Sequence, residues 1–213
     1  MSSKKNSIYE RWDIEPEVIS DLIDDNPSLR GMVLGYVAEK KFHDMYLEHP
    51  DITEATKDDD HDRLKKGDRR ITYKNHELLV EVKSLQTKTC KQLDDGTWVG
   101  KSQVDGSDKR VIKFKDGSEL ATTLLLKGEF DLLAVNCFAF GDTWKFAFAK
   151  NSDLPTSNFR KYTEEQRNQL IASLVEVKWP PEAPFTDDPY QLLDEMIKEQ
   201  EDQQTADVLD ITS

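Results

Sequence analysis

The feature that most constrains this chain is a run of apolar residues near its middle, Phe130 to Phe140, broken only by an aspartate and an asparagine. The run is too short to cross a membrane, which takes roughly 20 consecutive apolar residues. Its composition predicts a buried strand over residues 130–138. The Gly141-Asp142 pair that follows predicts a turn into an antiparallel partner strand, residues 144–149.

Alternating apolar and polar residues predict three more strands earlier in the chain, at residues 69–73, 78–84 and 110–114. The first two follow each other closely across residues 74–77, so we expect them to pair as a hairpin. Residues 121–127 fit a short helix or a strand. The chain therefore carries enough strands for one sheet with a buried centre.

Helical spacing and capping signals predict helices on both sides of these strands. They cover residues 15–29 with a break at Asn26-Pro27, 31–47 with Ser28 as cap, 163–174 and 190–201. The stretches without periodicity are predicted to be a loose start (1–12), a loop (51–66) and a disordered tail (201–213). This order of elements predicts an α/β fold, a mixed sheet of about five strands flanked by helices.

Composition limits the organisation of the chain and its surroundings. Its 213 residues suit one domain, which we place at residues 1–181, followed by an acidic helix and tail at 182–213. The net charge of -13 disfavours a simple nucleic-acid binder, but the acid is concentrated at both ends and residues 60–130 are mildly basic. Two cysteines, Cys90 and Cys137, without an apolar leader segment predict reduced thiols in a cytoplasm.

The stretch that carries chemistry combines Asp68 with Glu81-Val82-Lys83 on the two predicted hairpin strands. Side chains alternate along a strand, so Glu81 and Lys83 point to one face while Val82 points to the other, into a core. The hairpin returns Glu81 towards Asp68, and two adjacent carboxylates repel unless a cation lies between them. Mg²⁺ prefers such carboxylates, and a neighbouring lysine can orient or deprotonate a water. The pattern thus predicts a metal-dependent site for phosphate chemistry.

These residues resemble the PD-(D/E)XK nuclease superfamily, in its restriction endonuclease-like branch. The family pattern is an acidic residue, a variable gap, then Glu or Asp, any residue and Lys. Here it reads Asp68, twelve residues, then Glu81-Val82-Lys83, with Gly67 in place of the motif's proline. Glu39 matches a glutamate that many members carry on the preceding helix, and Gln86 matches a polar residue beyond the lysine.

The resemblance implies a restriction endonuclease-like core and a Mg²⁺-dependent DNA endonuclease, with Mn²⁺ as a substitute. Asp68, Glu81 and the Val82 carbonyl would hold the metal, and Lys83 would position the attacking water. In-line attack would leave 5′-phosphate and 3′-hydroxyl ends. The implied partners are double-stranded DNA, a second copy of the chain in a homodimer, and a separate specificity or methyltransferase protein.

Other interpretations stay open at this stage. A repair or junction nuclease would share the fold, and a non-catalytic interaction scaffold would use the acidic ends. Glu81 and Lys83 also fit a structural salt bridge, and Glu39 fits an ordinary surface glutamate. A second Glu-x-Lys copy, Glu176-Val177-Lys178 with Asp153 upstream, is disfavoured because a helix rather than a hairpin is predicted between them.

The remaining polar residues have simpler predicted roles. Asp131 is expected to bond the backbone or a basic neighbour at the start of the buried strand. The four histidines show no metal spacing and are predicted to lie on the surface; they are His43, His49, His61 and His76. Several basic residues lie around the motif in sequence and are candidates to contact phosphates, namely Arg69, Arg70, Lys88, Lys91, Lys101, Lys109 and Arg110.

Overall fold

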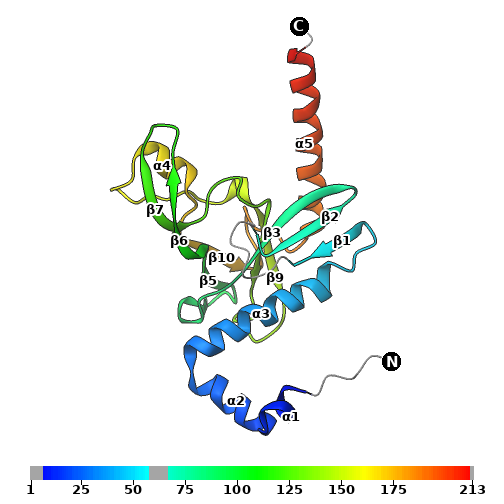
Figure 1. The fold of residues 1–213 in the computed structure, drawn as a ribbon, viewed down its shortest axis with the longest axis vertical. Helices are drawn as coiled ribbons and strands as arrows, with labels where there is room; N and C mark the ends of the chain where they lie inside the picture. The colour runs from blue at the N-terminus through cyan, green and yellow to red at the C-terminus, as the bar shows by residue number, and fades with distance from the viewer. Residues whose placement is uncertain (1–6, 58–66, 212–213) are drawn as a thin grey trace. The chain divides into compact units, whose positions relative to one another are not determined.

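The computed structural model describes residues 7–57 and 67–211, with side chains as far as Gln203 (Figure 1). This part of the chain forms two compact units, one up to Val37 and one from Ala38 onward. The helices are α1 (Ile8–Trp12), α2 (Pro16–Asp25), α3 (Pro27–Tyr46), α4 (Glu164–Gln169) and α5 (Pro189–Ile211), with short 3-10 helices η1 (Thr87–Thr89) and η2 (Asn151–Asp153). The strands are β1 (Ile52–Thr56), β2 (Arg69–Tyr73), β3 (His76–Ser84), β4 (Lys91–Gln92), β5 (Trp98–Gln103), β6 (Asp105–Lys113), β7 (Glu119–Leu124), β8 (Leu132–Asn136), β9 (Phe146–Lys150) and β10 (Leu174–Trp179).

The first unit consists of α1, α2 and the beginning of α3. The prediction of a loose start was wrong for residues 8–12, because Ser7 and Glu10 form a capping box that begins α1. The predicted break at Asn26 is confirmed, since α2 ends one residue before it and α3 begins one residue after. Ser28 is not the cap that we predicted, because Pro27 is already helical. No residue of α1 or α2 is buried.

The second unit is built on a five-stranded sheet in the order β1-β2-β3-β8-β9. Strands β3 and β8 are parallel, and the other neighbours are antiparallel. The predicted mixed α/β sheet is therefore confirmed. The predicted hairpin is also present, with a turn of two residues, Lys74 and Asn75, that both have positive φ. Such a turn matches the twist of the paired strands.

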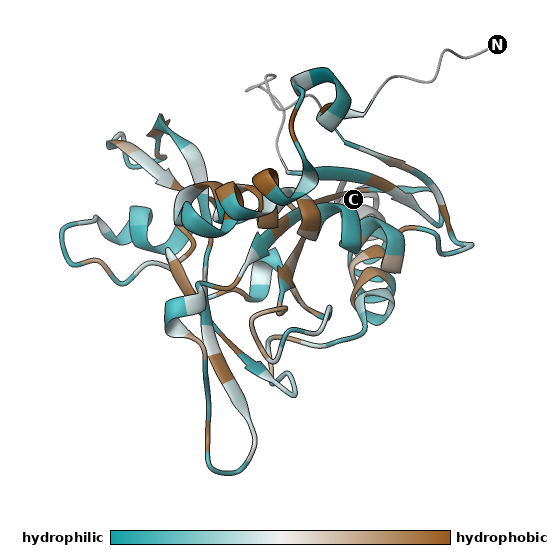
Figure 2. Ribbon diagram, turned by 90° about the horizontal axis from the view of Figure 1, so that it is seen from below, coloured by the Kyte–Doolittle hydropathy of each residue, from teal (hydrophilic) through white to brown (hydrophobic). Residues whose placement is uncertain are grey.

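One face of this sheet packs against α3 and α5. Phe42 from α3 and Leu193 from α5 meet Val80, Val82 and other apolar residues of the strands in one buried cluster. The Tyr73 hydroxyl donates a hydrogen bond to Asp194 and so links β2 to α5. Figure 2 shows that α5 carries both apolar and polar residues. The C-terminal segment thus contributes to the core, and its backbone is helical to Ile211, so the prediction of a disordered tail from residue 201 was wrong.

The opposite face carries a second core. Leu133 and Val135 of β8 pack there against residues from a three-stranded sheet, β10-β5-β4. Strands β6 and β7 pair separately as a hairpin, whose Phe114 and Leu124 pack with Leu170 beside α4. Residues 121–127, for which helix and strand were both predicted, begin as β7.

Several boundaries differ from the predictions; the strand predicted at residues 110–114, for example, is β6 and begins at Asp105. Residues 52–56 were predicted as loop but form β1, a polar edge strand that pairs with β2; residues 58–66 lie outside the described chain. Helix α4 begins at the predicted cap, Thr163, but ends at Gln169 instead of residue 174. The next two residues, Leu170 and Ile171, bridge to other segments instead. Among the described helices none is long and apolar enough to cross a membrane.

Candidate active site

Strand pairing places Asp68 next to the Glu-x-Lys motif. Arg69 faces Val80 in the β2–β3 register, so Asp68 comes opposite Glu81. The Asp68 N–H donates to the Val80 carbonyl over 2.9 Å, and the Val82 N–H donates to Asp68 Oδ2 over 2.8 Å. These two bonds fix the carboxylate at the edge of β3. The N–H and C=O of one strand residue point the same way, so the Val82 carbonyl also points towards the Asp68 side.

Glu81 and Lys83 lie on the face of β3 that turns away from α3 and α5. Their partners across the parallel pairing are Leu133 and Val135, which belong to the second core. Glu81 is only 7% exposed, and its Oε1 lies 2.5 Å from Lys83 Nζ. The ion pair that the structural interpretation predicted is therefore present, beside apolar residues of the second core.

The protonation of this pair is strongly perturbed. Burial raises the pKa of Glu81 to about 7, with the Lys83 charge lowering it and the charges of Asp68 and Glu129 raising it further. Burial on its own would lower the pKa of Lys83, but the charges of Glu81 and Asp68 raise it above its ordinary value. The charged lysine and the ionised glutamate thus stabilise each other, whereas burial favours the protonated form of Glu81. Perturbed groups of this kind are typical of functional sites.

The other two predicted site residues lie at the margin of this cluster. Glu39 on α3 is ion-paired with Lys57, whose Nζ lies 2.8 Å from Oε2, and Arg69 lies 4.0 Å from the same oxygen; the charge of Glu39 also acts on Lys83. It is therefore paired, not a lone surface glutamate. Gln86 follows β3 and donates through Nε2 to Gln103 on β5, over 2.7 Å. Among the described residues its side-chain amide bonds no carboxylate of the cluster.

The sequence interpretation left Glu129 without a role. This residue is buried, accepts from the Leu126 N–H over 2.9 Å and forms an ion pair with Arg110 of β6. The signal that could have found it is an acidic residue directly before the apolar run of β8. Two residues on, Asp131 accepts from the Leu79 N–H over 2.7 Å, so its predicted backbone bond is confirmed.

The second Glu-x-Lys copy forms a different environment. Glu176 is exposed on β10, which belongs to the three-stranded sheet. Lys178 pairs with Glu182 over 2.7 Å, at the solvent side of that strand. Asp153 lies in η2, where it accepts from the neighbouring Ser152. A helix, α4, lies between the two acids, as predicted.

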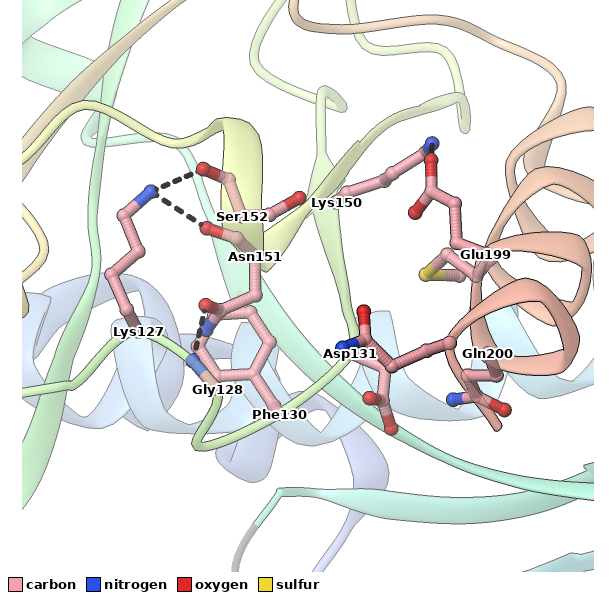
Figure 3. A pocket seen from close by; sticks show the side chains of 11 residues that line it. Lys127, Gly128, Phe130, Asp131, Lys150, Asn151, Ser152, Glu199 and Gln200 are labelled. Carbon is pink, nitrogen blue, oxygen red and sulfur yellow. Dashed lines mark hydrogen bonds and ion pairs between the residues drawn. The ribbon is translucent and has the colours of Figure 1, made fainter. Parts of the chain in front are cut away.

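Two other features lie apart from this cluster. His43, Asp44 and Glu48 bring ligand atoms within 4.8 Å of one another at the end of α3, although the sequence showed no metal spacing for His43. They are largely exposed, and Asp44 is paired with Lys40. A pocket of about 380 Å³ opens between α5 and the start of β8, lined by Asp131, Lys150 and Glu199 among others (Figure 3). Lys150 is ion-paired with Glu199 there.

Comparisons with family models, curated proteins and solved structures found no match to this chain. Function is therefore inferred from the geometry of the cluster.

Proposed function

We propose that this chain is a metal-dependent DNA endonuclease of the restriction endonuclease-like kind. The observation that supports this proposal is that Asp68, Glu81 and Lys83 meet on two paired strands, in a mixed sheet with helices on one face. A carboxylate pair with a charged lysine, set in a largely buried environment, is costly for stability alone. Such an arrangement is understandable if it serves a reaction.

The donor set suits a hard divalent cation. Asp68, Glu81 and the Val82 carbonyl offer oxygen atoms only, which Mg²⁺ and Mn²⁺ prefer over softer ligands. Burial and the charge of Asp68 both act against ionisation of Glu81, and a cation beside the two carboxylates would offset that cost. Bound at these oxygens, the metal would supply Lewis-acid polarisation of a phosphate oxygen and acidify a water.

The protein's own residues have defined parts in such a reaction. Asp68 is held by the Val82 N–H, so its free oxygen has a fixed direction. Lys83 keeps its charge next to Glu81, and its ammonium would orient the attacking water and balance charge on the phosphate. In-line attack would leave 5′-phosphate and 3′-hydroxyl ends. A homodimer would let two such sites cut both strands, and a specificity or methyltransferase protein would be a further partner.

A plasmid-cleavage assay tests the proposal. Mg²⁺ or Mn²⁺ should support cleavage, excess chelator should stop it, and Ca²⁺ should support binding with little turnover. Discrete fragments would indicate a restriction enzyme, whereas preference for a branched substrate would indicate a repair or junction nuclease. Absence of cleavage with every metal and substrate would leave the interaction scaffold.

A matched pair of lysine variants locates the site. Lys83→Ala should lower the cleavage rate by at least ~100-fold, the scale of a positioned acid–base group. Lys178→Ala removes a lysine from the same local sequence, Glu-Val-Lys, and should leave the rate unchanged, because its partner Glu182 is exposed. The reverse result would move the active site to Asp153 and Glu176.

A further inference from the structure

The β6–β7 hairpin carries an ion pair that the proposed reaction does not use. Arg110 of β6 donates through Nη2 to Glu129 and, over 3.3 Å, to the Leu124 carbonyl. The two side chains differ strongly in exposure, 38% for Arg110 and 5% for Glu129. A buried carboxylate thus binds the guanidinium of a side chain that is partly exposed to solvent.

The remaining donors of this arginine are placed for a ligand. A guanidinium has five N–H groups in a rigid fork. Within the described residues both hydrogen bonds of Arg110 start from Nη2, so Nη1 and Nε make no hydrogen bond there, and the side chain is partly exposed. The hairpin has a second ion pair, Lys113 with Glu119, whose side chains are 80% and 55% exposed. That pair is an ordinary surface contact and provides a natural comparison.

Hydrogen bonds connect this hairpin to the end of β3. Gln86, three residues after Lys83, donates to Gln103, and Gln103 donates to Asp105 at the base of β6 over 3.2 Å. Asp105 is the register partner of Leu124, the residue whose carbonyl binds Arg110. The base of the hairpin that carries Arg110 is therefore hydrogen-bonded to the segment just after Lys83. Glu129 is also among the charges that act on Glu81.

We propose that Arg110 binds a backbone phosphate of the substrate beside the Asp68–Glu81–Lys83 cluster, and that Glu129 is a positioning residue for its guanidinium. A planar guanidinium can meet two phosphate oxygens at once while a carboxylate orients it from behind. Asp68 and Glu81 place negative charge where a phosphodiester must approach, and the Arg110 guanidinium would attract the phosphate together with Lys83 and the bound metal. This inference rests on the proposed function, because the phosphate is that of the DNA to be cut.

The test removes the pair without leaving a buried charge alone. The double variant Arg110→Met with Glu129→Gln keeps side chains of similar size and removes both charges of this ion pair together, so the protein should melt near the wild-type temperature. The matched control is Lys113→Met with Glu119→Gln in the same two strands. Binding of a fluorescent DNA duplex is measured by anisotropy in Ca²⁺ across a salt series, and plasmid cleavage is measured in Mg²⁺.

We expect the Arg110/Glu129 double variant to bind the duplex more weakly, with a salt dependence reduced by about one ion, the value for one lost phosphate contact. Its cleavage rate should fall at least ~10-fold, and the control should match the wild type. A folded double variant that binds and cuts normally would overturn the proposal. If it does not fold, Arg110→Lys decides: this variant keeps the charge but loses the fork, and should cut at least ~5-fold more slowly; an unchanged rate overturns the inference.

The two proposals fail differently in this experiment. If the wild type binds duplex but never cuts, the nuclease proposal fails, and the salt series still decides the role of Arg110. If the wild type does not bind duplex at low salt, both proposals fail. If it cuts and the double variant cuts equally well, only the arginine inference fails.

Discussion

The titration of Glu81 offers a quantitative test of the buried cluster. The pKa of this carboxyl is 4.5 in an ordinary environment and about 7 in the folded protein, mainly because of burial. An acid whose pKa is raised by folding holds its proton more tightly in the native state than in the unfolded state. Its favourable contribution is complete below pH 4.5 and is lost as the pH rises to about 7. Without metal, the folded protein should therefore lose stability across this window because of this one group.

The structure sets the size of the loss. A rise in pKa from 4.5 to about 7 corresponds to about 3 kcal/mol of unfolding free energy. Asp131 also has a pKa that burial raises from its ordinary value. Such a group changes stability in the same direction as Glu81, so the total curve alone would not isolate Glu81.

The assay is urea unfolding in excess chelator, followed by far-UV circular dichroism between pH 4.5 and 7.5, for the wild type and Glu81→Gln. The difference between their unfolding free energies should change by about 3 kcal/mol across this range, because the glutamine cannot titrate and the other groups cancel. In Glu81→Gln, Lys83 loses its charged partner, which changes the unfolding free energy of the variant at every pH. The difference in pH dependence between the two proteins remains. Parallel curves would refute the reasoning and place Glu81 in a wetter environment. Mg²⁺ at pH 7.5 should stabilise the wild type more than Glu81→Gln.

Three further predictions concern the rest of the molecule. Phe42→Ala should lower the unfolding free energy by roughly 3–5 kcal/mol in urea, because its ring is buried between α3 and the sheet. Ending the chain after Asp194 should abolish cooperative thermal unfolding, since buried apolar residues of α5 are lost, whereas ending it after Gln203 should shift the melting temperature little. A thiol reagent at pH 8, followed by absorbance, should label Cys90 before Cys137, because Cys137 is buried and burial raises its thiol pKa to about 12.

Much of the fold could be predicted because local signals agreed with the final packing. The alternation over Arg69–Tyr73 gave β2 its observed bounds, and the apolar run gave β8. Strand β1 was missed because an edge strand needs few buried side chains, and its sequence, ITEAT, looks like a polar loop. The capping box of Ser7 and Glu10 was readable in the sequence and should have predicted α1.

The residues of the candidate site could also be predicted only in part. Asp68, Glu81 and Lys83 could be brought together in advance because one hairpin register fixes all three. The pair of Arg110 and Glu129 could not, because it depends on a register shift in the β6–β7 pairing between Asp105 and Arg110. The local sequence carries no signal for such a register shift. Moving the strand pairing by one residue would turn the Arg110 side chain to the other face of the hairpin.

The charges of the enlarged cluster give a final argument for reading it as one site. The charges of Asp68 and Glu129 both act against ionisation of Glu81, and the charge of Lys83 acts in its favour. A divalent cation beside Asp68 and Glu81 would offset the repulsion between their carboxylates, and a phosphodiester would in turn offset part of the added positive charge. If the proposed function is right, bound metal should strengthen DNA binding, and bound DNA should strengthen metal binding. The reason is that the two ligands carry opposite charges and so neutralise each other in a largely buried site.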